Sequence, residues 1–344
     1  MEVAIVITVK NEARLLRQNI FYHLGIGVKK MFIYFDNTTD GGRELVESID
    51  GVFCSESITS NKYDDLPYLK KFTNQKFTQH SARQCINSYD AELQCIKEGI
   101  DWLISIDADE FFLLPRSEGY KTIQEFFKSA SAQNYDIVRF GVFEVIPRKM
   151  KYDLVAIEET LFKTKKNFKS KFDQIYFEIT DPYTKDKITT HFWLSHNMGK
   201  SAIRTGRDII PHNVHKYKAR HEGQHVKTLF SGHILHYFQY DLYDFIKKSQ
   251  NFKLRPKHYL SGKRIGRLKN LYIRLVNDEN KTIEDITIFY KKNLLFNQRK
   301  VSRLYKTRVF NILPRREDAV IEITDVRDVL LPYKSLIYTR DRKT

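Results

Sequence analysis

The sequence is poor in the residues that define several other classes of protein. Three cysteines among 344 residues, without a Cys-x-x-Cys pair, argue against a disulfide framework and a zinc knuckle. Fourteen glycines and eight prolines exclude a collagen-like or linker-dominated chain. No apolar run approaches the ~20 residues needed to span a bilayer. We therefore expect a reduced, cytoplasmic protein whose first apolar residues form a strand rather than a signal peptide.

What remains is the composition of a folded protein with a strongly basic segment. Hydrophobic residues make up 42% of the chain and charged residues 29%, and the formal net charge is +16. Residues 241–316 hold 20 Lys and Arg against 6 Asp and Glu, so nearly all the excess lies there. Such a segment fits anionic lipid headgroups, nucleic acid or an acidic polymer, or is a solvated basic face that keeps the protein soluble.

Strands alternate with helices in the first 140 residues. Continuous apolar runs predict buried strands at 3–9, 31–35 and 102–106, and helical spacing predicts helices at 11–25 and 77–100. Shorter patterns add further elements, which are helices at 43–50 and 122–130 and strands at 52–54 and 137–140. This alternation predicts an α/β fold with a mostly parallel sheet flanked by helices.

The composition changes near residue 240. After this point apolar residues recur at helical spacing with Lys and Arg between them, most clearly from Leu268 to Val276. We therefore predict an α/β domain over 1–240, followed by a basic helical segment with a short tail over 241–344.

The motif Asp107-Ala108-Asp109-Glu110 carries the strongest functional signal. It follows a predicted buried strand, and ligands of open α/β sheets bind beyond the carboxyl ends of the strands. Two carboxylates two residues apart in such a turn can face one Mg²⁺ or Mn²⁺, cations that also hold substrate phosphates. The alternative is a solvated turn or helix-capping aspartates.

Two other loops are predicted to open onto the same edge of the sheet. Lys10-Asn11-Glu12 follows the first strand, and a loop that begins at Asp36 follows the second. Neither has the glycine spacing of a dinucleotide fingerprint or a P-loop, so side chains rather than a glycine-rich backbone would read a nucleotide. Ordinary turn and capping chemistry is the alternative for both loops.

Later in the chain, cations and histidines cluster. Lys200 and Arg204 offer positive charge to a diphosphate, and eight of the eleven histidines lie between residues 191 and 236. No histidine pair has the spacing of a zinc site with further ligands. One or two of these histidines would therefore complete a metal or phosphate site, and the others would be ordinary surface or core residues.

Taken in order, these residues resemble the GT-A glycosyltransferases, and among them glycosyltransferase family 92 and its bacterial family-2-like relatives. The matching elements span about residues 3–240: Lys10-Asn11-Glu12, Phe35 to Asp40, Trp102 to Phe111, Arg139 to Gly141, Gly199 to Arg204, Val214-His215 and His236-Tyr237. The pattern departs from the family after Gly141, where Val142 to Pro147 replace a stretch of small residues.

The resemblance implies a GT-A, Rossmann-like fold and a metal-assisted, inverting transfer from a nucleotide sugar. It implies that Asp36 reads the uracil of UDP and that Asp107 lies near the ribose. Asp109 would bind Mn²⁺ or Mg²⁺, with Asp107 beside it. Lys200 would face the diphosphate, and His236 would join the metal or diphosphate site.

For the general base we select Glu144. It follows the predicted strand 137–140 and a turn at Gly141, and its apolar neighbours would raise its pKa toward the working range of a base. The alternatives are that Glu144 is an exposed strand residue and that Glu178, Asp181 or Asp208 is the base.

The sequence thus predicts an enzyme that moves a hexose from a UDP-sugar to an acceptor of a surface polysaccharide or glycolipid. Galactose as the sugar is indicated only by analogy within the family. The acceptor would be a glycan or a lipid-linked glycan, and the basic segment 241–316 would place the protein at the inner face of an anionic membrane. The alternative function is nucleic-acid binding through the same segment, whose basic residues are interleaved with Tyr and Phe.

Overall fold

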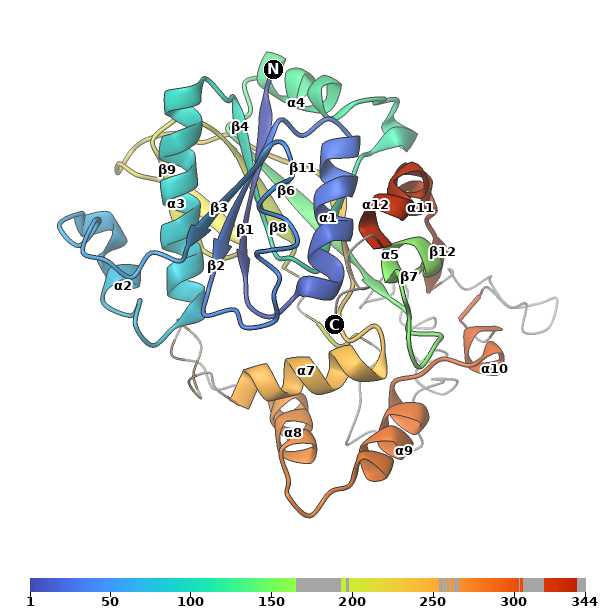
Figure 1. The fold of residues 1–344 in the computed structure, drawn as a ribbon. Coiled ribbons are helices and arrows are strands. Elements are labelled where there is room, and N and C mark those ends of the chain that lie inside the picture. Colours follow the sequence, from blue (N-terminus) through green and yellow to red (C-terminus); the bar gives the residue numbers. More distant parts are fainter. Residues whose placement is uncertain are drawn as a thin grey trace, which may run out of the picture. The chain divides into compact units, whose positions relative to one another are not determined.

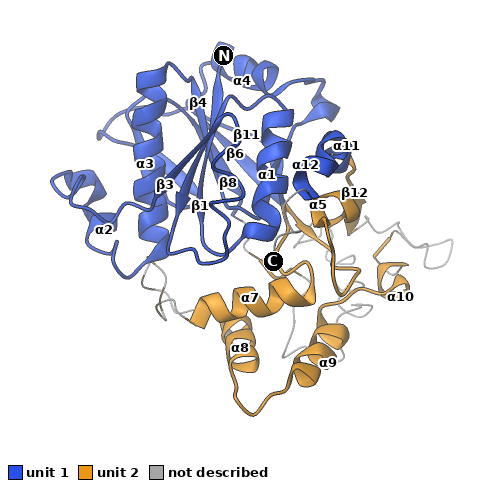
Figure 2. Cartoon of the chain, in the orientation of Figure 1, with its two compact units in different colours: residues 1–142, 198–235, 325–344 blue, residues 143–197, 236–324 orange. Residues whose placement is uncertain are grey.

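A computed structural model of the chain describes residues 1–164, 193–195, 198–253, 266–302 and 319–338, together with residues 256, 258, 260, 262, 304 and 305. The chain divides into two compact units, coloured separately in Figure 2. Unit 1 comprises residues 1–142, 198–235 and 325–344, and unit 2 comprises residues 143–197 and 236–324. The predicted boundary near 240 lies close to the break after Leu235. The chain also passes between the units at three other points, so neither unit is one continuous segment.

Unit 1 is built on a sheet whose first four strands are parallel (Figure 1). Its strands are β1 (Val3–Val9), β2 (Lys30–Phe35), β3 (Val52–Glu56), β4 (Trp102–Ile106), β5 (Glu110–Leu113), β6 (Ile137–Val145), β8 (Lys200–Arg204), β9 (Ile209–Asn213), β10 (Lys216–Ala219) and β11 (Thr228–His236). The order β3-β2-β1-β4 is parallel. β8 follows beside β4 as an antiparallel strand, and β6 pairs with β8, again antiparallel. β11 pairs with β5 and β6, and β9 and β10 form a separate hairpin. The last residues of β6 and β11 belong to unit 2.

Helices flank the parallel strands of unit 1. They are α1 (Ala13–Gly25), α2 (Lys70–Thr73), α3 (His80–Glu98), α4 (Ile123–Ala132), α11 (Asp325–Leu330) and α12 (Lys334–Tyr338), with 3₁₀ turns at Pro67–Leu69, Arg116–Glu118 and Leu331–Tyr333. Every residue of β1, β2 and β4 is buried, as their continuous apolar runs predict. Ala91 and Cys95 of α3 pack in one core with Ala4 and Val6 of β1. The predicted α/β class, with a largely parallel central sheet and flanking helices, is confirmed.

Most predicted elements of unit 1 form, and one does not. Helices α1, α3 and α4 match the predicted helices, and Gly99 ends α3 in the left-handed conformation at φ 68°. Residues 43–50 form consecutive turns instead of the predicted helix. A helix this short depends on tertiary packing rather than on propensity, and the periodicity of the segment does not report that packing. The prediction for this segment is therefore wrong.

Unit 2 contains short strands and a series of helices. Its elements are the end of β6, β7 (Leu161–Lys163), β12 (Val320–Glu322), α5 (Val155–Glu158), α7 (Leu242–Lys253), α8 (Arg267–Val276), α9 (Ile283–Asn293) and α10 (Gln298–Ser302). Phe245 of α7 packs in one core with Tyr272 of α8 and Tyr290 of α9. The helix predicted around 268–276 is therefore present as α8. Among the described residues, no helix combines the length and apolar character needed to cross a membrane.

Candidate functional site

The loops predicted to share one edge of the sheet do share it. β1 is paired in parallel with β2 up to Val9 and Phe35, and with β4 up to Ile7 and Ile106. The segments that follow these three strands therefore leave the sheet at the same carboxyl edge, where open α/β sheets bind ligands. Lys10-Asn11-Glu12, Asp36 and the turn from Asp107 to Glu110 are brought together in unit 1.

The first two loops are tied to each other by hydrogen bonds. The Asn11 side chain accepts a hydrogen bond from the Thr39 backbone N–H at 2.8 Å, and Asp40 accepts one from the Ala13 N–H at 2.7 Å. Asn11 itself has φ 56°, in the left-handed region that asparagine tolerates better than most residues. Lys10, Asn11 and Glu12 are half-buried, so these loops form a fixed border of the site.

Asp36 is buried and held by two basic side chains of α3. Its carboxylate accepts hydrogen bonds from Arg83 Nε at 2.5 Å and Arg83 Nη2 at 2.8 Å, and it pairs with His80 Nδ1. Burial by itself would raise the pKa of Asp36, but the hydrogen bonds and positive charge of His80 and Arg83 hold it well below the usual range. The carboxylate is therefore ionised and fixed at the carboxyl edge, and its contact with uracil stays a prediction.

Sequence patterns missed His80, Arg83 and Gln84 as members of this site. All three lie in the first turns of α3, the helix that precedes β4. A helix that leads into a parallel strand begins at the carboxyl edge of the sheet, and this connection was the available signal. Gln84 donates a hydrogen bond from Nε2 to Asp107 Oδ1, so it joins α3 to the acidic turn.

The acidic turn after β4 is closed by its own hydrogen bonds. The Asp107 carbonyl accepts from the Glu110 N–H at 3.0 Å, and Glu110 Oε2 accepts from the Asp107 N–H at 2.8 Å. The side chain of Asp107 is 32% exposed, whereas Asp109 and Glu110 are buried. The turn thus presents Asp107 to solvent and uses Glu110 to hold its own shape.

Lys200 supplies a buried positive charge to this turn. Its Nζ lies 2.9 Å from Asp107 Oδ2 and 3.4 Å from Glu110 Oε2, and its side chain is fully buried. Burial lowers the pKa of Lys200, but the neighbouring carboxylates of Asp107, Glu110 and Asp109 outweigh burial and raise the pKa above its ordinary value. The structure therefore places a permanent cation beside the carboxylates, and the contact of Lys200 with a diphosphate stays a prediction.

Arg204 does not join this group. β8 is antiparallel to β4, with Ser201 beside Ser105 and Arg204 beside Trp102 at the start of β4. Four residues of an extended strand span roughly 13 Å, so Arg204 lies at the opposite edge of the sheet from Lys200. The predicted diphosphate contact of Arg204 is therefore wrong, because the two ends of one strand lie at opposite edges of the sheet.

The donor set of the acidic turn is suited to a hard cation. Carboxylate oxygens are the ligands that Mg²⁺ and Mn²⁺ prefer, and such ions commonly keep waters and substrate phosphates as further ligands. Both Asp107 oxygens already have protein partners, Lys200 and Gln84. No group of three or more His, Cys, Asp or Glu side chains that could hold a metal ion occurs in the described part of the chain. Phosphate or water ligands would therefore have to complete the coordination.

His236, predicted as a further metal ligand, belongs to unit 2. It is buried, and its ring lies 5.4 Å from the ring of Phe238. Its part in metal binding stays a prediction. Of the alternative bases, Glu178 and Asp181 lie outside the described residues. Asp208 follows β8 and is ion-paired with Arg220 at 3.2 Å.

Glu144 lies in a different environment from the one predicted. β6 continues through Gly141 to Val145, so there is no turn at Gly141. Glu144 is buried in unit 2, 2.6 Å from Lys163 Nζ, and its oxygens accept hydrogen bonds from the backbone N–H groups of Leu194 and Ser195. Burial raises its pKa, but Lys163 and the hydrogen bonds dominate and lower it. The expected rise in pKa is wrong, because a charged strand neighbour outweighs the apolar ones.

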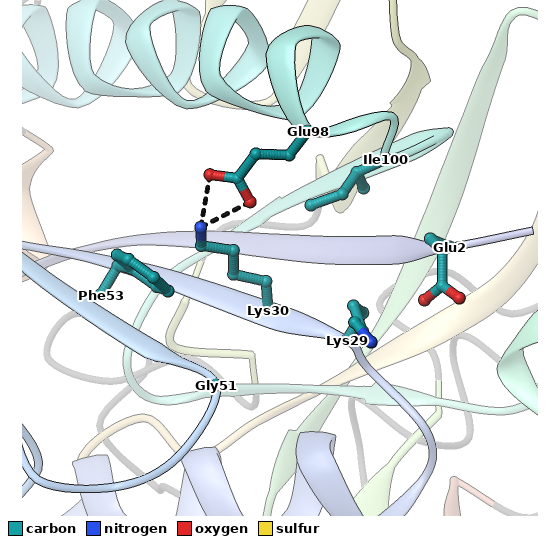
Figure 3. Close-up of a pocket in the computed structure, with 7 residues that line it drawn as sticks. All are labelled: Glu2, Lys29, Lys30, Gly51, Phe53, Glu98 and Ile100. Atoms are coloured by element: carbon teal, nitrogen blue, oxygen red, sulfur yellow. Dashed lines mark hydrogen bonds and ion pairs between the residues drawn. The ribbon is translucent and has the colours of Figure 1, made fainter.

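A separate cavity of about 270 Å³ lies at the amino edge of the same sheet (Figure 3). Figure 3 shows Lys30 pointing toward Glu98, and the Lys30 Nζ also lies 3.3 Å from the centre of the Phe53 ring. Glu2 immediately precedes β1 and Lys30 is the first residue of β2, so both lie at the strand ends farthest from the acidic turn. This cavity is therefore not part of the candidate site.

The fold and the site define an α/β protein with a carboxylate and lysine cluster at the carboxyl edge of the parallel strands. The model of glycosyltransferase family 92 matches residues 4–274 of the chain. The chain therefore belongs to glycosyltransferase family 92, which confirms the resemblance drawn from the motifs.

Similar proteins include family members from plants. A glycosyltransferase family 92 protein of Oryza sativa subsp. japonica is 29% identical over 126 residues, which cover 36% of this chain and 18% of that protein. One of Ricinus communis is 30% identical over 125 residues, with the same shares. The matched segment thus spans less than a fifth of the length of these relatives.

Among solved structures, Staphylococcus aureus TarS 1–349 is 10% identical and has a TM-score of 0.35, with 85% of this chain and 72% of that chain covered. The glucosyl-3-phosphoglycerate synthase of Mycobacterium tuberculosis, solved with Mn²⁺, UDP and phosphoglyceric acid, is 10% identical with a TM-score of 0.28. That match covers 60% of this chain and 57% of that one. Matches with this identity and TM-score give no information about the substrates of this chain.

Proposed function

We propose that the protein is a metal-dependent, inverting glycosyltransferase that moves a hexose from a UDP-sugar to a hydroxyl group of a glycan acceptor. Membership of glycosyltransferase family 92 supports the transfer of a sugar. The observation that carries the proposal is the acidic turn at the carboxyl edge of β4, with Lys200 Nζ 2.9 Å from Asp107. Carboxylates and a lysine at this edge fit a diphosphate and its counter-ion.

Each group in the site has a distinct part in this reaction. Asp109, with Asp107 beside it, would hold Mn²⁺ or Mg²⁺, and Lys200 binds the diphosphate and keeps it oriented. Asp36, fixed by Arg83, faces the uracil. When bound, the metal ion would neutralise negative charge on the departing diphosphate.

A carboxylate base is proposed to remove the proton of the acceptor hydroxyl while that oxygen attacks the face of the sugar opposite the leaving diphosphate. Glu144 stays the candidate for this base. Its two carboxylate oxygens would first have to leave Lys163 and the backbone N–H groups that now occupy them. The identity of the base is therefore tested separately below.

Ligand-dependent thermal stabilisation tests the donor assignment. A ligand that binds only the folded protein stabilises it by RT ln(1 + [L]/Kd), or about 2.7 kcal/mol at a hundredfold excess over Kd. We expect UDP to raise the melting temperature with Mn²⁺ present and to have a smaller effect in EDTA. Equal shifts with GDP or CDP would refute the uridine assignment, and an equal UDP shift in EDTA would refute metal dependence.

Identification of the sugar needs a donor screen. Hydrolysis of a panel of nucleotide sugars, UDP-galactose among them, should single out one UDP-hexose. A preference for a donor on another nucleotide would contradict the role proposed for Asp36.

The acceptor is proposed to be a glycan or lipid-linked glycan at a membrane surface, reached through the basic segment 241–316. Ile283 and Ile288 of α9 are exposed large apolar side chains, and Lys291 and Lys292 follow them on the same helix. Each Lys or Arg near an anionic membrane contributes about 1 kcal/mol, and salt screens this attraction.

Flotation with phosphatidylserine vesicles tests this surface. We expect binding at low salt, loss of binding at high salt, and loss on replacing Lys291 and Lys292 by Gln. Equal recovery with neutral phosphatidylcholine vesicles would refute the electrostatic contact. Tight, salt-sensitive RNA binding would instead support the nucleic-acid function.

A further inference from the structure

Three buried polar side chains of α1 bond to the backbone around the acidic turn. Asn19, Tyr22 and His23 lie at positions i, i+3 and i+4, so they share one face of the helix. The exposed fractions of the three residues are 0%, 1% and 0%. A helix face packed on a sheet normally carries apolar side chains, so three polar groups here need a specific purpose.

Asn19 holds both sides of Asp109. Its Nδ2 donates hydrogen bonds to the Ala108 carbonyl at 3.1 Å and to the Glu110 carbonyl at 2.7 Å. These carbonyls belong to the residues immediately before and after Asp109. One side-chain amide thus fixes the peptide group that precedes Asp109 and the one that follows Glu110, so the backbone is held on both sides of Asp109.

Tyr22 and His23 extend the same network two residues along β5, from Glu110 to Phe112. The Tyr22 hydroxyl donates to the Phe112 carbonyl at 2.8 Å, and His23 Nε2 accepts from the Phe112 N–H at 3.1 Å. Because Nε2 accepts, Nδ1 carries the proton and donates to the backbone carbonyl and Oδ1 of Asn19, each at 2.9 Å. Burial lowers the pKa of His23 to about 3, so the ring stays neutral and keeps this tautomer at neutral pH.

We propose that Asn19, Tyr22 and His23 are positioning residues, which fix the backbone of the acidic turn so that Asp107 and Asp109 can bind a divalent cation and the donor diphosphate. This inference rests on the proposed function of the turn. It adds to that proposal the part of α1 that fixes the direction of the metal-binding side chains. If these residues had only a structural role, they would anchor β5 to α1, and their replacement would not change the affinity of the turn for a cation.

A matched pair of variants separates the two roles. Asn87 of α3 is also fully buried in unit 1, and it makes three hydrogen bonds, with Thr8, Ser57 and Ile58, none of them to the acidic turn. We expect Asn19→Ala to weaken Mn²⁺ binding at least tenfold, measured by Mn²⁺ electron paramagnetic resonance, and Asn87→Ala to change it less than twofold. Backbone amides of residues 107–112 should exchange hydrogen faster in Asn19→Ala only.

A second pair of variants, with smaller changes, tests the same inference if Asn19→Ala does not fold. Tyr22→Phe removes one hydroxyl that bonds to the Phe112 carbonyl, and Tyr34→Phe removes one that bonds to Asp90 at 2.6 Å. We expect Tyr22→Phe to raise exchange at residues 107–112 and to weaken Mn²⁺ binding about threefold, with turnover reduced and the KM for acceptor unchanged. Tyr34→Phe should leave all four readouts as in the wild type.

The outcomes distinguish this inference from the proposed function. Wild-type protein that binds neither Mn²⁺ nor UDP would refute the proposed function, and the positioning role with it. Wild-type protein that binds both, with Mn²⁺ affinity unchanged in Tyr22→Phe or altered equally in Asn19→Ala and Asn87→Ala, would refute the positioning role alone.

Discussion

Replacing Glu144 by Gln tests whether this residue is a catalytic base or one half of a buried ion pair. Glu144 and Lys163 stand opposite each other on β6 and β7, 2.6 Å apart, with side chains 1% and 0% exposed. Gln keeps the shape of the side chain and can still accept from a backbone N–H. It removes the negative charge, however, and so leaves the buried Lys163 ammonium without the Glu144 carboxylate.

The structure sets the size of the expected effect. Removal of one partner of a buried ion pair typically costs about 3–5 kcal/mol, because the remaining charge stays in a region of low dielectric. We expect Glu144→Gln to lower the free energy of unfolding by about this amount. Because replacement of both partners is often close to neutral, Glu144→Gln combined with Lys163→Met should recover most of the loss.

Glu158 provides a matched control in the same unit. It also lies 2.6 Å from a lysine, Lys149, and also accepts from two backbone N–H groups, but its side chain is 27% exposed and that of Lys149 is 53% exposed. Glu158→Gln should therefore cost only about 1 kcal/mol, as exposed ion pairs do. Urea unfolding of the full chain followed by circular dichroism, with sugar transfer measured on the folded protein, compares these variants.

The pH dependence provides an independent check on the ion pair. Folding lowers the pKa of Glu144 from its ordinary value of 4.5, so its contribution to stability is complete above pH 4.5 and is lost as pH falls through the lower folded-state value. A Glu144→Gln variant with near-normal stability would refute the ion-pair argument. Normal stability with transfer reduced by a factor of ~100 or more would instead support Glu144 as the base.

Four further predictions follow from the site. Asp109→Ala should abolish transfer and the Mn²⁺-dependent part of UDP binding without lowering the melting temperature, and near-normal turnover would contradict the metal assignment. Lys200→Met should weaken UDP binding about tenfold, because a charge-assisted hydrogen bond contributes roughly 1.5–3 kcal/mol, yet leave uridine binding unchanged in calorimetry; equal losses would place Lys200 away from the diphosphate. His236→Ala should reduce turnover more than stability, whereas a large fall in melting temperature with normal turnover would indicate a buried structural histidine. Burial lowers the pKa of His23 from 6.5 to about 3, so stability should fall by up to roughly 5 kcal/mol as pH drops from 6.5 to 3. Urea unfolding should show this slope in the wild type and a smaller one in His23→Gln.

The type and order of most helices and strands of unit 1 could be predicted from the sequence. Continuous apolar runs identify β1, β2 and β4 because strands buried on both faces have no polar side. Helical spacing identifies α1, α3, α4 and α8. Once the strands are known to be parallel, their carboxyl ends share an edge, so the sequence also determined that Asp36 and the acidic turn would meet there.

The partners of the charged side chains were decided only by the tertiary structure. Lys200 reaches Asp107 because β8 lies antiparallel beside β4, and the same pairing carries Arg204 to the far edge. Glu144 meets Lys163 because β6 pairs with β7. Periodicity reports how each segment is buried, but not which segments become neighbours. A pKa depends on charges within a few ångströms, and these come here from residues 19 and 93 positions away in the chain.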